Sequence, residues 1–336
     1  MKIAVVGTGV AGAYLLNRLP SGVEAEAFEA RTEKNWYTVC AWGTSQPFIS
    51  DLVKEAGFNF DDYVLHKGKN MVVDLGDEEI NIPLRGLVTY DKHRLTEDML
   101  KGKRIHWGAQ IKEVDGNFKD FDAVVDATGM HRSLLPKASE DLLIPSLEYQ
   151  VKSKELPYDD FVIKPYPGLT GYWWYFPLGD GMAHVGAGDL RGRYRYELDE
   201  FAKKYHCEIV KRIGRPVRVT PPKFMEPFFD GKVTGVGESI GTVYPMLGEG
   251  IIPSMQCVNL YVDHLGDNEG YRRAVLDHFS VYAKVYEFIK AKVEDRFSLM
   301  RMLPTLMSIF LYMRGNERRY GLQTRLGDFY KIATRL

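Results

Sequence analysis

The feature of this 336-residue chain that most constrains its fold is a glycine-rich turn directly after the first hydrophobic segment. Residues 2–6 read KIAVV, a run typical of a buried parallel strand. Gly7, Gly9 and Gly12 follow in Gly-x-Gly-x-x-Gly spacing, which provides a tight turn, room for a pyrophosphate and close helix packing. Residues 11–19, AGAYLLNRL, predict the helix, whose N-terminus favours phosphate charge. We therefore expect a dinucleotide-binding βαβ unit here.

A second strand and an acidic residue complete this unit. Residues 22–30 read GVEAEAFEA and predict a strand that carries Glu29 at its end, seventeen residues after Gly12. A carboxylate at this place can accept hydrogen bonds from a ribose hydroxyl. A glycine-rich turn without a ligand is the alternative, but the order of strand, motif, helix, strand and acid favours binding.

The rest of the chain does not continue as regular βα units. Residues 35–48, NWYTVCAWGTSQPF, follow neither a helical nor a strand period. A second apolar strand ending in glycine comes at 121–129, FDAVVDATG, and a third strand, glycine-rich loop and helix are expected within 231–265. Three separate glycine-bearing strand ends indicate one cofactor that is contacted at three places.

These three segments together resemble the FAD-binding motifs of the flavoprotein hydroxylase fold, and more narrowly the geranylgeranyl reductase family. The resemblance implies an α/β fold, in which a Rossmann-type FAD-binding domain carries an inserted antiparallel-sheet substrate domain and a helical C-terminal extension. It implies FAD as the cofactor, with the ADP half held by the first motif and the acid at Gly7, Gly9, Gly12 and Glu29.

The resemblance also assigns cofactor contacts to the second and third motifs. The second motif places Ala127, Thr128 and Gly129 near the FAD. The third keeps the family's proline and Gly-Glu-Gly-Ile pattern, which assigns Pro245, Gly248, Gly250 and Ile251 to the same site. Two positions depart from the family. Glu238 stands where relatives carry a ribityl-contacting aspartate, and Lys92 aligns with a cofactor-contacting arginine.

A Cys-x-x-Gly sequence makes the resemblance to the geranylgeranyl reductase family more specific. Cys40 and Gly43 match the pair that geranylgeranyl reductases place beside the flavin, and the resemblance makes them the catalytic positions. Our hypothesis is that the Cys40 thiol orders the substrate alkene or the flavin, or donates the proton. Cys207 and Cys257 are expected to be ordinary small buried residues.

A second motif that makes the resemblance to the geranylgeranyl reductase family more specific lies in residues 171–188, GYWWYFPLGDGMAHVGAG. It matches the Tyr-x-Trp-x-Phe-Pro sequence of the family's substrate pocket, which assigns substrate contacts to Tyr172, Trp174, Phe176 and Pro177. In an extended strand the three aromatic residues project from one face, where they can form one wall of an apolar slot. The alternative is a strand in a sheet core, where aromatic residues are also favoured.

The resemblance implies an FAD-dependent reductase that saturates carbon–carbon double bonds of a polyprenyl (geranylgeranyl) lipid. An isolated alkene is not polarised by a carbonyl, so we expect protonation towards a tertiary cation together with hydride from reduced flavin. The faces of Tyr172, Trp174 or Trp42 are expected to stabilise the positive charge. The chain carries no second Gly-x-Gly-x-x-Gly, and either NADPH or a ferredoxin-type protein remains open as the electron donor.

Several alternative functions remain open. A flavin-dependent monooxygenase, a halogenase or a non-redox carotenoid cyclase would share the fold, and a binding protein would show no flavin turnover. A serine hydrolase would use Ser239 in the Gly-x-Ser-x-Gly sequence at 237–241, with Asp263, His264, Asp267 and His278 downstream.

Composition excludes several classes of protein. The net charge of −1 gives no field for nucleic acid, and the scattered histidines form no metal motif. Three cysteines suit a reducing compartment, and the first residues are a strand and not a signal peptide. We therefore expect a cytoplasmic protein, soluble or peripheral at a membrane surface.

The final residues are expected to be helical. Residues 271–297 predict one packed surface helix, and 302–313 form a nearly apolar helix followed by a basic end, in which 314–336 hold six basic and two acidic residues. This is either a buried helix with a solvated tail or a docking surface for anionic lipid at 302–336.

The motif positions predict the division of the chain into domains. The FAD-binding domain is expected to be discontinuous, comprising 1–50, 85–145 and 226–265. The substrate domain takes 51–84 and 146–225, and the C-terminal helical region takes 266–336.

Overall fold

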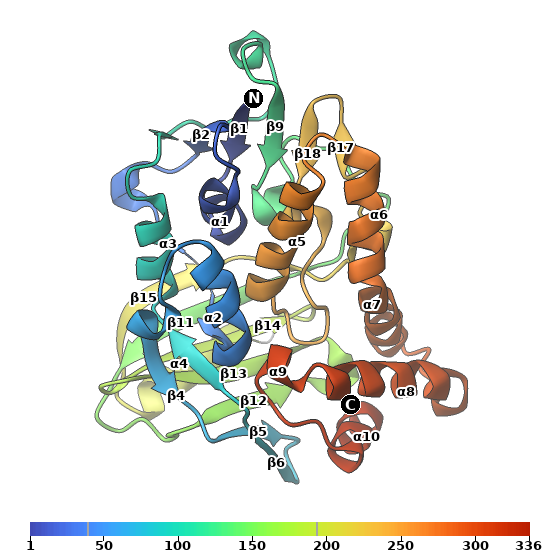
Figure 1. Ribbon diagram of the computed structural model, residues 1–336. Coiled ribbons are helices and arrows are strands. Elements are labelled where there is room, and N and C mark those ends of the chain that lie inside the picture. Colours follow the sequence, from blue (N-terminus) through green and yellow to red (C-terminus); the bar gives the residue numbers. More distant parts are fainter. Residues whose placement is uncertain (39, 193) are drawn as a thin grey trace.

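The computed structural model describes residues 1–38, 40–192 and 194–336, and two large sheets organise it (Figure 1). The first is a six-stranded sheet in the order β17-β18-β9-β1-β2-β8. Its strands are β1 (Lys2–Val6), β2 (Glu24–Glu29), β8 (Ile105–Trp107), β9 (Ala123–Asp126), β17 (Phe229–Asp230) and β18 (Val233–Gly235). All neighbours are parallel except the edge pair β17–β18.

The predicted strand–turn–helix–strand unit is confirmed around β1. This strand is buried between β2 and β9, and Gly7 then turns the chain with a φ of +100°. Helix α1 (Val10–Arg18) follows at once. A Cβ atom on Gly12 would overlap the carbonyl oxygen of Gly7, so only glycine lets the helix start this close to the strand end.

The second large sheet has seven strands in the order β15-β11-β14-β13-β12-β5-β6. They are β5 (Asn70–Asp74), β6 (Glu79–Pro83), β11 (Ser146–Lys152), β12 (Phe161–Pro165), β13 (Gly171–Gly179), β14 (Met182–Asp189) and β15 (Glu208–Gly214). Only the β12–β5 pair is parallel. One face packs on helix α4 (Tyr194–Lys204), where Trp173 and Tyr175 contact Phe201.

Smaller elements lie near both sheets. They are a three-stranded sheet of β3 (Gly43–Ser45), β7 (Leu87–Tyr90) and β4 (Val64–Lys67), a pair of β10 (Leu143–Ile144) and β16 (Val217–Arg218), and helices α2 (Gln46–Glu55) and α3 (Lys92–Leu100). The α/β fold class is as expected. The proposed domain boundaries stay a prediction.

The C-terminal region is helical, but its arrangement differs from the expectation. After α5 (Ile251–Asp263), which follows the third glycine motif, it contains α6 (Asn268–His278), α7 (Ser280–Val293), α8 (Leu299–Gly315), α9 (Glu317–Tyr320) and α10 (Leu326–Arg335). The single surface helix predicted for 271–297 is wrong. The helix breaks at Phe279 into α6 and α7, and both bury aromatic side chains such as Tyr271 and Tyr282.

Helix α8 is not the buried helix that its composition suggested. It buries Leu306, Ile309 and Met313, whereas Met300, Leu303, Met307 and Leu311 are exposed at helical spacing. No helix in the described part of the chain is long and apolar enough to cross a membrane.

Buried polar contacts tie the C-terminal residues to the rest of the molecule. The guanidinium of Arg319, which is 4% exposed, pairs with Glu249 in the loop before α5. The carbonyl oxygen of Gly321 accepts hydrogen bonds from the amides of Arg85 (2.7 Å) and Leu87 (3.1 Å). The last helices are therefore fixed against the third glycine motif and the three-stranded sheet.

Candidate functional site

A cavity of about 1210 Å³ is lined by both large sheets and the C-terminal helices. Most residues singled out from the sequence line it, although they come from distant parts of the chain. They are Gly7, Gly9, Glu29, Cys40, Gly43, Lys92, Ala127, Thr128, Gly129, Tyr172, Trp174, Phe176, Glu238, Pro245, Gly248, Gly250 and Ile251. The structure thus brings the three glycine motifs, the Cys-x-x-Gly motif and the Tyr-x-Trp-x-Phe-Pro motif to one cavity.

Of the catalytic, cofactor and substrate positions that the resemblance assigns, Gly12 and Pro177 do not line the cavity. Gly12 serves the packing of α1 on Gly7, as described above. Pro177 is at the end of β13, where its carbonyl oxygen accepts a 2.6 Å hydrogen bond from the hydroxyl of Thr89. Its assignment as a substrate contact is not supported, because this proline joins β13 to β7 and lies outside the cavity lining.

The start of α1 forms the polar end of the cavity. Helix α1 has no side-chain cap and no acidic residue in its first turn, so its terminal amides remain available to an anion. The space beside Gly9 is open, with no heavy atom within 4 Å of where a Cβ would stand. Glu29 is held nearby, because its carboxylate accepts hydrogen bonds from Thr8 Oγ1 (2.7 Å) and the Arg31 amide (2.9 Å).

The second motif is organised by Asp126, which is fully buried at the end of β9. Its carboxylate accepts hydrogen bonds from Thr128 Oγ1 (2.6 Å) and from the amide of Leu134 (2.8 Å). The acid of this motif therefore shapes the loop, while Ala127, Thr128 and Gly129 line the cavity.

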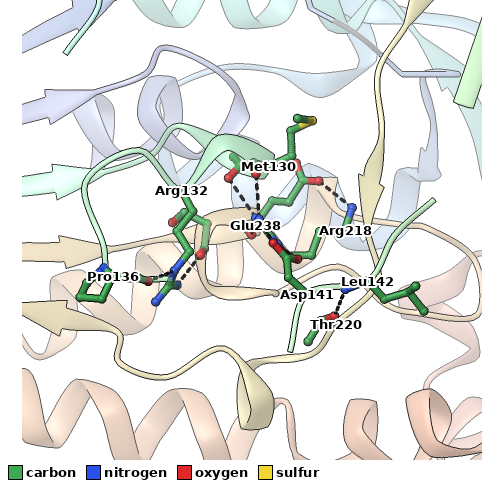
Figure 2. Close-up of polar contacts among 10 residues, drawn as sticks. Met130, Arg132, Pro136, Asp141, Leu142, Arg218, Thr220 and Glu238 are labelled. Atoms are coloured by element: carbon green, nitrogen blue, oxygen red, sulfur yellow. Dashed lines mark hydrogen bonds and ion pairs between the residues drawn. The ribbon is translucent and has the colours of Figure 1, made fainter. Parts of the chain in front are cut away.

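Arg218, which sequence reasoning missed, joins the second and third motifs (Figure 2). Its guanidinium is buried and donates to Asp141 (2.7 and 2.9 Å) and to the carbonyl oxygens of Met130 (2.8 Å) and Glu238 (2.9 Å). The Arg218 amide donates to the Glu238 carboxylate (3.1 Å). Glu238 is thus fixed from β16, with its side chain at the cavity wall.

Arg132, just after the second motif, also makes buried contacts in this region (Figure 2). Its guanidinium donates to the carbonyl oxygens of Pro136 (2.8 Å) and Ser239 (2.7 Å). Burial lowers the pKa of Arg132 to about 10, and the neighbouring charge of Arg218 acts in the same direction.

The serine hydrolase interpretation is wrong. Ser239 is fully buried and does not line the cavity. Its hydroxyl donates to the carbonyl oxygens of Asp126 (2.8 Å) and Val236 (3.0 Å), so it stabilises the turn after β18.

The Cys-x-x-Gly segment meets the aromatic motif directly. Cys40 lines the cavity with a φ of 147°, a conformation in the region that favours glycine. A Cβ on Gly43 would stand 2.5 Å from the ring of Phe176, so the glycine lets this ring lie against the β3 backbone. Trp42 does not line the cavity, and its ring packs edge-on against His184 with centroids 4.7 Å apart. The expectation that Trp42 faces the substrate is therefore wrong.

Ionisable groups gather around Cys40. Burial raises the pKa of the Cys40 thiol, the charge of Lys92 opposes this shift, and Glu148 adds to it. Burial lowers the pKa of Lys92, and Cys40 opposes that change. The thiol is therefore held in its neutral form at this place.

Tyr172 and Trp174 line the cavity and make polar contacts at its wall. The hydroxyl of Tyr172 donates to the carbonyl oxygen of Leu247 (2.5 Å), which ties β13 to the third glycine motif. The indole of Trp174 donates to the carboxylate of Glu148 (3.3 Å). Glu148 also lines the cavity, and sequence reasoning did not identify it.

The part of the cavity beyond Phe176 is apolar. Met71, Ile82, Leu87 and Ile163 pack around this ring and line the cavity. Helix α10 supplies further apolar lining residues, which are Phe329, Ile332 and Ala333. We refer to the lining at the glycine motifs as the polar arm of the cavity, and to the lining around Phe176 and from α10, which also includes Asp328, as the apolar arm. Within the described residues, no cluster of metal-ligating side chains is present.

Comparisons with known proteins were made for the sequence and for the structure. No family model matches the chain. An uncharacterized protein of Methanocaldococcus jannaschii is 24% identical over 295 residues, which cover 75% of this chain and 80% of that protein. Digeranylgeranylglycerophospholipid reductase 1 of Methanosphaera stadtmanae is 26% identical over 168 residues, which cover 47% of this chain and 40% of the reductase.

Solved structures give a broader match. A geranylgeranyl bacteriochlorophyll reductase-like protein from Thermoplasma acidophilum superposes with a TM-score of 0.72 at 16% identity, over 99% of this chain and 96% of that protein. The chain has the fold of FAD-dependent oxidoreductases. The fold also occurs in halogenases. CmlS, a flavin-dependent halogenase, superposes with a TM-score of 0.63 at 13% identity, over 98% of this chain and 69% of the halogenase.

The contact between Gly43 and Phe176 yields a prediction about the cavity wall. Gly43→Ala is expected to displace the Phe176 ring and to lower the free energy of unfolding by about 1–3 kcal/mol, because the added methyl overpacks the contact. Urea unfolding midpoints measure the change. Gly116→Ala is the matched control, since no atom lies within 4 Å of its Cβ position. Equal midpoints for the two variants would contradict the predicted contact.

Proposed function

We propose that this protein is an FAD-dependent reductase that saturates carbon–carbon double bonds of a polyprenyl lipid. The observation that carries the proposal is one cavity with a polar arm at three glycine motifs and an apolar arm walled by Tyr172, Trp174 and Phe176. The likeness to a geranylgeranyl reductase-like structure and to a digeranylgeranylglycerophospholipid reductase supports it.

The polar arm fits FAD. The uncapped first turn of α1 and the open space beside Gly9 suit the pyrophosphate, and Glu29 suits a ribose hydroxyl. Ala127, Thr128 and Gly129 would lie along the cofactor, together with the loop from Pro245 to Ile251. When bound, FAD supplies the hydride.

The apolar arm fits a prenyl chain. Such a chain has no polar group along its length, so its affinity comes from apolar burial at about 25 cal/mol per Å². Trp174 and Phe176 offer large flat surfaces near Cys40, and Met71 and Ile163 continue the wall. A dry wall of this kind also excludes water from the reacting carbons.

Cys40 is assigned to alignment of the alkene. Cys40 lines the cavity, three residues before Gly43, against which the Phe176 ring packs. Burial raises the pKa of the Cys40 thiol and so keeps the thiol neutral. A neutral thiol is a small, polarizable group that an alkene can contact.

A second candidate function follows from the halogenase neighbours, which share this fold. A halogenase or monooxygenase would consume oxygen with reduced flavin. The two candidates therefore differ in what oxidises the reduced cofactor.

An anaerobic single-turnover measurement tests the proposal. The bound flavin is reduced chemically, which makes the natural electron donor (NADPH or a ferredoxin-type protein) unnecessary. Addition of a geranylgeranyl lipid is expected to restore the oxidised flavin spectrum and to yield a saturated lipid. Oxidation only after air is admitted would reject prenyl reduction and favour oxygen-using chemistry.

The same assay tests Cys40. Cys40→Ala is expected to slow lipid-dependent flavin oxidation by about 10- to 100-fold, because misplacement of a reacting group costs this much. Cys207→Ala is the matched control, because Cys207 packs on the opposite face of the seven-stranded sheet. An unchanged rate with intact FAD would reject the role of Cys40.

We further propose that α8 and α10 dock on an anionic lipid surface. On α8 the exposed residues Met300, Leu303, Met307 and Leu311 form an apolar stripe, and on α10 Leu326 and Tyr330 are exposed. The two helices contact each other through Phe310 and Phe329. Because α10 also lines the apolar arm, a lipid bound at this surface would lie next to the cavity. Arg301 and Arg325, both exposed, supply charge complementary to anionic headgroups.

Vesicle sedimentation tests this surface. The double variant Leu303→Ser/Leu311→Ser is expected to bind phosphatidylglycerol vesicles at least about 10-fold more weakly, since each exposed leucine loses its burial in the membrane. Leu65→Ser/Val210→Ser, which changes two exposed apolar residues elsewhere, is the matched control. Equal binding by both double variants would contradict the docking surface.

A further inference from the structure

A carboxylate and an imidazole are buried together at the cavity face of the seven-stranded sheet. Glu148 on β11 is 4% exposed and His184 on β14 is fully buried. Glu148 Oε1 lies 2.8 Å from His184 Nδ1, and Glu148 Oε2 accepts the 3.3 Å hydrogen bond from the Trp174 indole. Glu148 itself lines the cavity, so the pair is connected to the space assigned to the lipid.

The strand register explains how these three side chains meet. Glu148 on β11 and Trp174 on β13 both pair with Gly186 on the strand between them. A Cβ on Gly186 would overlap the indole, so the glycine lets Trp174 lie across β14 and reach Glu148. His184 is two residues before Gly186, on the same face of the sheet.

This pair is not explained by stability. Burying a carboxylate with an imidazole costs desolvation free energy that apolar residues of similar size would not cost. The surrounding wall uses such residues elsewhere, including Phe176 and Ile163. The charge of Glu148 acts on the pKa values of Tyr37, Cys40 and Lys92. The charged residues Lys211, Arg215, Glu238 and Glu249 line the same cavity.

We propose that Glu148 and His184 together hold one exchangeable proton and that Glu148 delivers it to the prenyl alkene; this inference rests on the proposed function. The π bond breaks as one carbon takes the proton and forms a new C–H bond. When bound, the reduced cofactor would supply hydride, with both electrons, to the other carbon. The pair is left with one negative charge, and a proton from water restores it after the product leaves.

The chemistry favours this pair over the Cys40 thiol as the proton source. Protonation of an isolated alkene requires a strong acid, and burial raises the pKa of Cys40, which makes the thiol a weaker one. A carboxylic acid or an imidazolium is stronger. His184 acts here as a positioning residue, because its Nδ1 lies 2.8 Å from Glu148 Oε1 and the Trp42 ring packs edge-on against its imidazole.

The kinetic test compares two carboxylate-to-amide changes in the anaerobic assay. Glu148→Gln is expected to slow lipid-dependent flavin oxidation by about 100-fold or more and to leave FAD content and oxidation by oxygen unchanged. Asp199→Asn is the control, because Asp199 accepts a hydrogen bond from Tyr149 on the opposite face of the same sheet. Glu148→Asp keeps an acid and is expected to recover part of the rate. A wild-type rate for Glu148→Gln would overturn the proposal.

A spectroscopic test does not depend on turnover. Infrared and nitrogen-15 histidine spectra of the wild-type holoenzyme are expected to show either a protonated carboxyl that is absent in Glu148→Gln, or a doubly protonated His184 ring. A carboxylate beside a neutral imidazole at the assay pH would overturn the proposal even if the lipid is reduced. If the proton is present but the lipid is not reduced, the proposed function and the proton donation both fail.

Discussion

The aromatic wall of the cavity depends on two positions where a neighbouring strand carries no side chain. Phe176 lies against the backbone at Gly43, and Trp174 lies across the backbone at Gly186. A methyl group at either place would clash with the ring and displace it. These contacts also join separate parts of the chain, since Gly43 belongs to the loop of Cys40 and Gly186 places Trp174 over Glu148.

Buried cations join the second and third glycine motifs to each other and to the C-terminal helices. Arg218 ties Met130 after the second motif to Glu238 in the third, and Arg319 ties the third motif to the C-terminal helices. Removing one member of a buried ion pair costs about 3–5 kcal/mol, because the other charge stays buried without compensation. The loops that would contact the cofactor are therefore held by Arg218, which is outside the cavity lining, and by Arg319, which is part of it. The same arrangement makes the last helices part of the cavity wall.

Much of the fold and of the candidate site could be predicted from the sequence, because the glycine motifs and the aromatic strand are local patterns. The alternation in residues 171–179 placed Tyr172 and Trp174 on one face, as the structure has them. The alternation of apolar and polar residues gives the wrong prediction for Glu148. Leu147, Tyr149 and Val151 alternate with polar residues, and such a pattern predicts that the polar residues face solvent. Glu148 faces the cavity because both faces of this sheet are covered, one by α4 and the other by distant segments. Local patterns carry no information on such long-range contacts.

The central claim is that one cavity holds the cofactor and a prenyl chain side by side. Titration of the oxidised holoenzyme with a lipid that carries a saturated phytanyl chain tests this claim most directly, because such a lipid binds without reacting. The account predicts a saturable change in the visible flavin spectrum at one lipid per protein, and competition with the geranylgeranyl lipid. A glycerol lipid with a short chain is expected to cause no change. An unaltered flavin spectrum at saturating phytanyl lipid would contradict the account.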